Sequence, residues 1–135
     1  MQELRVIPIR LERDFPILKS WWEKRDFPPP NPRFLPPTGK LVISGEKPIC
    51  GGFLFRSDAG AAIIGHLVSN PHAPGAIRNA GLDALIESLT QEAREQGFEM
   101  ICCSTNLPRL MERFERHGLT KTDDGVANFG RVLCQ

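Results

Sequence analysis

The chain has 135 residues, of which 41% are hydrophobic and 24% are charged, and its formal net charge at pH 7 is +1. This balance is typical of one globular domain, and the length is sufficient for a hydrophobic core. It excludes a disordered chain and lacks the basic excess of a nucleic-acid-binding protein. We therefore expect a single domain over residues 1–135, with no nucleic-acid partner.

Signals for export, membranes and metals are missing from the sequence. The start, MQELRVIPIR, is too short and interrupted for a signal peptide, and no apolar run approaches the roughly 20 residues of a membrane helix. Cys50, Cys102, Cys103 and Cys134 show no CxxC spacing, so no metal site is predicted. Adjacent Cys102 and Cys103 indicate a buried strand rather than a nucleophile. We expect a cytoplasmic protein without a membrane partner.

The N-terminal part predicts a strand followed by a helix. Residues 4–9 form a short extended apolar run. Apolar residues then repeat at helical spacing from about Asp14, and the pattern ends near Asp26. Pro16 is expected in the first turn of this helix, where its missing N–H costs no hydrogen bond.

A proline-rich loop follows this helix. Half of the 12 prolines lie in FPPPNPRFLPP, residues 27–37, which is compatible with neither a helix nor a central strand. We expect a stiff surface loop bordering any acceptor site. The aromatic residues around it either line a substrate pocket or pin the loop against the sheet, and we favour pinning: Trp21, Trp22, Phe27 and Phe34.

Three strands are predicted next. Residues 40–44, 48–56 and 61–69 are apolar runs separated by short turn signals, which favours an antiparallel meander. Gly51 and Gly52 lie inside the middle run. Glycines in a strand indicate a bulge or a close approach of another backbone.

The second half alternates helices and strands. A helix is expected from about Ala76 to the stop at Gly97, followed by a strand at 100–104. Thr105 or Asn106 is expected to cap another helix. The turn signal at 123–125 predicts a final hairpin.

This element order specifies a fold class. It reads β-α-loop-β-β-β-α-β-α-β-β, in which residues 61–104 form a β-α-β unit. We therefore predict an α/β (α+β) fold with a mixed central sheet, mostly antiparallel with one parallel β-α-β pair, and helices on both faces.

The segment most informative for function is 69–89, where a strand passes through a Gly/Pro-rich turn into a long helix. A helix N-terminus presents unpaired N–H groups and binds phosphate without dedicated side chains. Arg78 adds a positive charge, and Gly81 removes a Cβ where a ligand would approach. The alternative interpretation is a plain strand-to-helix connection.

This segment resembles the acyl-CoA loop of the GNAT N-acetyltransferases, (Q/R)-x-x-G-x-(G/A). Arg78, Gly81 and Leu82 match the pattern, while Asp83 stands where a small residue is expected. Residues 104–119 are similar to the family's Asn-led last helix. The resemblance covers nearly the whole chain and is closest to short phage and prophage proteins of this type.

The resemblance implies a binding mode for acetyl-CoA as cosubstrate. The strands at 61–69 and 100–104 would splay apart, and the pantetheine arm would enter between them. The cofactor-binding residues carried over from the family are Leu67, Val68, Ser69, Arg78, Asn79, Ala80, Gly81, Leu82, Asp83, Asn106 and Phe114.

The resemblance also implies direct attack of an amine on the thioester. His66 is the candidate general base by position and by the pKa range of imidazole, the alternative being a hydrogen-bonded histidine at the sheet surface. Phe114 stands where many members carry an acid tyrosine, and the chain has no tyrosine at all.

Two functions follow. The first is N-acetyl transfer from acetyl-CoA to a small-molecule or protein amine. The second is a GNAT-fold protein of weak or lost activity that binds CoA or serves in an assembly. A homodimer is compatible with either.

Overall fold

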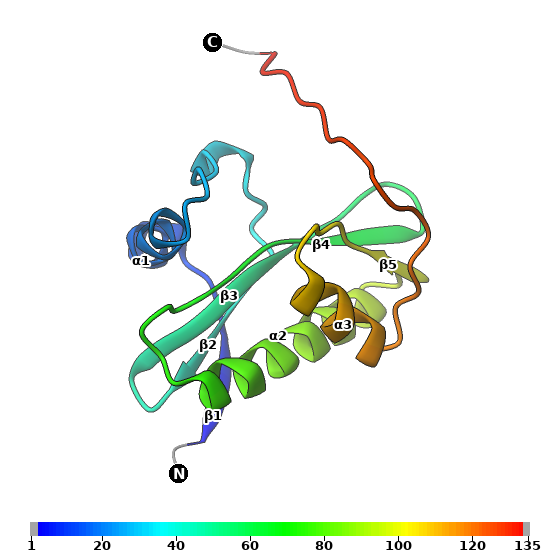
Figure 1. The fold of residues 1–135 in the computed structure, drawn as a ribbon. Helices are drawn as coiled ribbons and strands as arrows, with labels where there is room; N and C mark the ends of the chain where they lie inside the picture. Colours follow the sequence, from blue (N-terminus) through cyan, green and yellow to red (C-terminus); the bar gives the residue numbers. More distant parts are fainter. Residues whose placement is uncertain (1–2, 134–135) are drawn as a thin grey trace. The chain divides into compact units, whose positions relative to one another are not determined.

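The computed structural model describes residues 3–133 and divides the chain into two compact units, Met1–Ser104 and Thr105–Gln135. The single domain expected over residues 1–135 stays a prediction. The first unit holds a five-stranded sheet and two helices (Figure 1). Its elements, in chain order, are β1 (Leu4–Pro8), α1 (Leu11–Lys24), a 3₁₀ turn (Pro32–Phe34), β2 (Gly39–Ser44), β3 (Lys47–Phe55), β4 (Ala61–Ser69), α2 (Gly75–Glu95) and β5 (Met100–Cys102).

The sheet has the predicted mixed topology. Its strands lie in the order β1-β2-β3-β4-β5, and neighbours are antiparallel except for β4 and β5. The parallel pair runs from Ala61↔Met100 to Ile63↔Cys102, with α2 as the crossover between the two strands. The predicted fold class is therefore confirmed.

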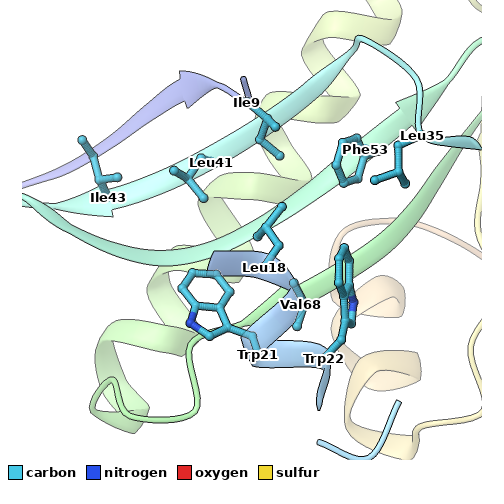
Figure 2. Packing of buried hydrophobic residues seen from close by; sticks show 9 residues of the cluster. All are labelled: Ile9, Leu18, Trp21, Trp22, Leu35, Leu41, Ile43, Phe53 and Val68. Carbon is cyan, nitrogen blue, oxygen red and sulfur yellow. The ribbon is translucent and has the colours of Figure 1, made fainter. Parts of the chain in front are cut away.

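The two helices cover opposite faces of the sheet, each over its own apolar cluster. Leu18, Trp21 and Trp22 of α1 pack on one face, where Phe53 is fully buried (Figure 2). Leu85 and Leu89 of α2 are fully buried on the other face. Burial of such side chains contributes roughly 1.5–3 kcal/mol each, so both helices are held by apolar packing.

Helix α1 begins at Leu11, earlier than the predicted Asp14. The buried Asp14 carboxylate accepts the backbone N–H of Arg10 (2.9 Å), which caps the first turn from inside the helix. Pro16 consequently lies in the second turn rather than the first.

The proline-rich segment 27–37 contains no strand, as predicted, but one 3₁₀ turn forms within it. There the Asn31 side chain accepts the N–H of Arg33 (2.9 Å). The loop is anchored by Leu35, which is buried in the α1-side core (Figure 2).

The second unit contains α3 (Pro108–Arg116). Its N-cap is Leu107, whose N–H donates to Thr105 Oγ1 (3.1 Å), so neither Thr105 nor Asn106 holds the cap position itself. Leu119 N–H donates to Phe114 O and Gly118 N–H to Glu115 O, and Gly118 has a φ of 88°. This Schellman geometry ends the helix.

The hairpin predicted around residues 123–125 is wrong. Gly125 does have a positive φ of 64°, as a turn requires, but residues 117–133 contain no strand. Phe129 in this stretch is 95% exposed. A two-stranded hairpin is marginal without a further sheet partner, so a turn signal alone does not specify strands.

Candidate functional site

Strand β4 has a free edge along most of its length. It spans nine residues, whereas its parallel pairing with β5 covers only Ala61 to Ile63. On the other side β4 pairs with β3 as far as Ser69. On the side away from β3, the backbone of residues 64–69 therefore has no strand partner in the described sheet. Apart from the Ser69 carbonyl, which accepts a hydrogen bond from Arg25, its outward N–H and C=O groups are left to bind an extended ligand.

A β-bulge interrupts β4 within this free edge. Gly51 of β3 pairs with Val68 and Phe53 pairs with Gly65, so Gly52 alone faces both His66 and Leu67. The sequence placed this irregularity at the glycines of β3, but the extra residue belongs to β4. A Cβ on Gly52 would lie 2.3 Å from Leu67 Cδ2, so a larger residue at that position would require the Leu67 side chain to move.

His66 is the bulged residue, and its φ of 54° lies in the left-handed region. That conformation is unfavourable for a non-glycine residue, and such residues concentrate at functional sites. The exposed imidazole lies 5.6 Å from the ring of Phe55 and 6.3 Å from the ring of Trp22, measured between centroids. Although His66 keeps an exposed surface, the groups packed around its imidazole partly desolvate it and lower the pKa of His66 below its ordinary value. A neutral imidazole at pH 7 is able to accept a proton.

The three residues after the bulge point in different directions. Leu67 packs against the α2-side cluster, and Val68 is buried in the α1-side cluster (Figure 2). Ser69 accepts two hydrogen bonds from Arg25, at its carbonyl and at its hydroxyl. These three residues therefore have only their backbone in common along the free edge of β4. The backbone is the part to which the GNAT resemblance assigns pantetheine.

The N-terminus of α2 is not capped by a side chain. Pro74 occupies the N-cap without a side-chain hydrogen bond, and the first turn has no acidic residue. The first intrahelical bond runs from Arg78 N–H to Pro74 O (3.0 Å), so the N–H groups of Gly75, Ala76 and Ile77 precede it. These donors and the helix dipole favour an anion.

Arg78 lies beside this helix start. Its Nε is buried and has no hydrogen-bond partner among the described residues. A Cβ built on Gly75 would lie 3.8 Å from Arg78 Nη2, which places the guanidinium over the first turn. A buried cationic donor left unbonded is unfavourable unless an anion completes it.

Gly81 lies against the sheet, and its assignment to the cofactor stays a prediction. A Cβ at this position would lie 2.9 Å from Ile49 Cγ2 and 3.2 Å from Cys50 Sγ. Its missing side chain therefore lets α2 pack closely on β3. The free N–H groups of the helix start belong to Gly75, Ala76 and Ile77, close to Ala76 where the sequence predicts that the helix begins.

The other residues of the motif lie on α2 beyond its free N–H groups. Asn79 and Ala80 are exposed, Leu82 packs against the α2-side cluster, and Asp83 is half-buried. Their assignment to the cofactor stays a prediction. Asn106 and Phe114 belong to the second unit, and their relation to the free edge of β4 is likewise a prediction.

The aromatic residues around the proline-rich loop divide into two groups. Trp21 and Trp22 are each 5% exposed and belong to the α1-side core (Figure 2), so they hold the helix itself. Phe27 and Phe34 are 44% and 50% exposed. Neither phenylalanine pins the loop, since Leu35 does.

Three further kinds of feature would bear on function within residues 3–133: a nucleophilic cysteine, a metal site and a membrane-spanning helix. Burial, and then the neighbouring Cys102, raise the pKa of Cys103 to about 11, which keeps this thiol protonated. In that part of the chain no cluster of His, Cys, Asp or Glu is able to hold a metal ion. No helix described there has the length and apolarity needed to cross a membrane. Cys134 lies outside the described residues.

No protein-family model matches the chain, and no curated protein matches it. Solved structures do match its fold. The ribosomal-protein-S18-alanine N-acetyltransferase of Escherichia coli superposes with a TM-score of 0.69 at 14% identity, over 90% of this chain and 80% of that one. An acetyltransferase of Trypanosoma brucei superposes with a TM-score of 0.64 at 14% identity, over 94% of this chain and 99% of that one. The N-acetylglutamate synthase of Neisseria gonorrhoeae, complexed with coenzyme A and N-acetyl-glutamate, gives 0.68 at 17% identity, over 93% of this chain and 30% of that one.

At these identities the likeness concerns the fold. The strand order, the single parallel pair and the helices on both faces agree with it. The chain therefore has the GNAT-like mixed α/β fold of these acetyltransferases.

Proposed function

We propose that this protein binds acetyl-CoA and transfers its acetyl group to an amine. The observation that carries the proposal is the continuity of two unpaired backbone surfaces. The free edge of β4 over residues 64–69 leads directly into the uncapped N-terminus of α2 at Gly75. An extended amide-containing arm that ends in a diphosphate is complementary to both surfaces.

In this arrangement the backbone of Leu67 to Ser69 pairs with the pantetheine arm. The N–H groups of Gly75, Ala76 and Ile77, together with Arg78, bind the diphosphate. The fit rests on donors that the structure leaves unused, because Arg78 Nε is buried without a partner and no side chain caps α2. The coenzyme A present in the Neisseria gonorrhoeae enzyme supports this class of ligand for the fold.

The chemistry requires little from side chains. The amine nitrogen attacks the thioester carbonyl carbon, the C–N bond forms, and the C–S bond breaks with release of the thiolate. His66, at the β4 bulge, accepts the proton that the amine loses. The thiolate leaves without a tyrosine acid, since the sequence contains none, and takes a proton from water.

The acceptor is an amine of a small molecule or a protein. The α1 side of His66, where Trp22 and Phe55 lie, is the surface from which it approaches. The compared structures come from cellular organisms and add no support for the resemblance to phage proteins.

The test is calorimetric titration with acetyl-CoA and CoA, followed by chromatographic measurement of CoA release with a panel of amines. We expect binding of both ligands and amine-dependent release of CoA. Absence of binding to either ligand contradicts the proposal. Binding without turnover across the panel supports instead a CoA-binding protein without transferase activity.

A further inference from the structure

Arg25 connects the end of α1 to the end of β4. It occupies the C-cap position of α1, and its guanidinium donates from Nε to Ser69 O (3.2 Å) and from Nη2 to Ser69 Oγ (2.8 Å). A guanidinium carries five N–H donors in a planar fork. Ser69 engages two of them, so three further N–H donors remain.

A second arginine, Arg78, stands over the first turn of α2, the helix that follows β4 in the chain. Burial lowers the pKa of Arg25, and the positive charge of Arg78 lowers it further. Neither arginine forms an ion pair with a carboxylate within residues 3–133. Two cations held together without an acid repel each other, and an anion between them removes that cost.

The surroundings of the pair indicate which anion fits. Arg78 stands over the first turn of α2, whose backbone donors already favour negative charge. Together these groups provide N–H donors and positive charge. A diphosphate has several anionic oxygens distributed over two phosphorus atoms, and arginine forks match phosphate oxygens in a bidentate manner.

We propose that Arg25 is a second diphosphate-binding arginine, which Ser69 orients and which acts together with Arg78 on the diphosphate of acyl-CoA. This role rests on the acyl-CoA binding proposed above. It assigns Ser69 a positioning function through its hydroxyl, in addition to the backbone contact with pantetheine. It also connects α1 to the bound cosubstrate.

The test compares wild type with Arg25→Gln, Arg25→Lys and Ser69→Ala against three ligands. These are CoA, 3′-dephospho-CoA, which keeps the diphosphate, and pantetheine, which has no phosphate. Arg94→Gln is the matched control, since it removes an equal charge from the opposite end of α2. Affinities are measured by calorimetry, or by NMR titration for pantetheine, with thermal unfolding of each variant.

We expect Arg25→Gln to lower the affinity for CoA and for 3′-dephospho-CoA by roughly ten- to a hundredfold and to leave the affinity for pantetheine unchanged. Arg25→Lys should recover part of the loss, because it keeps the charge but not the fork. Ser69→Ala alone should lower the affinity for CoA. Added to Arg25→Gln, the same substitution should lower that affinity no further. Arg94→Gln should bind all three ligands as wild type does.

An equal loss for pantetheine and CoA would mean that Arg25 only holds α1 against β4, and the inference would be overturned. It would also be overturned by an Arg25→Gln variant with wild-type CoA affinity. If wild type itself binds no CoA, the proposed function fails, and that result is distinguishable from either outcome.

Discussion

Gly81 of α2 and Ile49 of β3 lie so close that a Cβ on the glycine would come within 2.9 Å of Ile49 Cγ2. The contact joins the helix that carries the proposed phosphate site to the sheet that carries the proposed pantetheine site. The glycine is thus a packing residue, and the ligand contact that its place in the acyl-CoA motif suggests stays a prediction.

Gly81→Leu should lower the free energy of unfolding by about 1–3 kcal/mol, because the added side chain overpacks the α2–β3 contact. Urea denaturation measures the change. Ala80→Leu, on an exposed position of the same helix, is the control and should unfold like wild type. A Gly81→Leu variant of wild-type stability with reduced CoA affinity would support the ligand-contact interpretation.

His66→Asn should lower the rate of acetyl transfer at pH 7 by roughly 10²–10⁴-fold with unchanged CoA affinity. Asparagine tolerates a positive φ, so this variant keeps the bulge while removing the base. The wild-type rate should rise with pH through an apparent pKa below that of free imidazole, because burial lowers the pKa of His66. Initial rates from pH 5 to 8 test this.

A His66→Asn variant with the same transfer rate and the same pH–rate profile as wild type would exclude His66 as base.

The same depressed pKa has a consequence for stability. The unfolded chain binds a proton at His66 more readily than the folded one, so this contribution to stability is present above the unfolded pKa and is lost as pH falls through the folded pKa.

Gly75→Glu should separate stability from binding. A glutamate in the first turn of α2 replaces a glycine and complements the helix dipole, so the free energy of unfolding should rise by about 1 kcal/mol. A Cβ there meets only Arg78 Nη2, at 3.8 Å, so the change is sterically permitted. The carboxylate competes with the diphosphate, and CoA affinity should fall roughly tenfold or more.

Gly75→Gln is the uncharged match for this variant. It should keep most of the propensity gain and bind CoA more tightly than Gly75→Glu. Equal CoA affinity of the two variants, measured by calorimetry, would show that the diphosphate does not bind at this helix end.

Phe114→Tyr should keep or increase the transfer rate. The change adds one hydroxyl on α3 at the position where the resemblance to GNAT acetyltransferases implies an acid tyrosine, and general acid catalysis typically contributes 10²–10⁴-fold. Steady-state kinetics with the best acceptor measures the effect. A lower kcat with intact CoA binding would show that residue 114 does not reach the leaving thiolate.

Local patterns in the sequence were sufficient for the fold, because each strand and helix of the first unit has its own apolar period and its own stop. Gly97, for example, ends α2 with a φ of 87°, as its position after the apolar stripe predicted. The hairpin around residues 123–125 failed because strands depend on a pairing partner that a turn signal does not specify.

The site was less accessible to sequence reasoning, for two physical reasons. The bulge at His66 depends on the register between β4 and β3, which the pair Gly51-Gly52 indicated only on the opposite strand. The contact of Arg25 with Ser69 joins residues 44 positions apart, and no local motif indicates it.

The most direct measurement is an amide NMR titration of ¹⁵N-labelled protein with CoA. The amides of Leu67, Val68 and Ser69 on β4, and of Gly75, Ala76 and Ile77 on α2, should shift together with one affinity. Saturating CoA that leaves both groups unshifted, or that shifts only amides elsewhere, would contradict an acyl-CoA site built from the β4 edge and the start of α2.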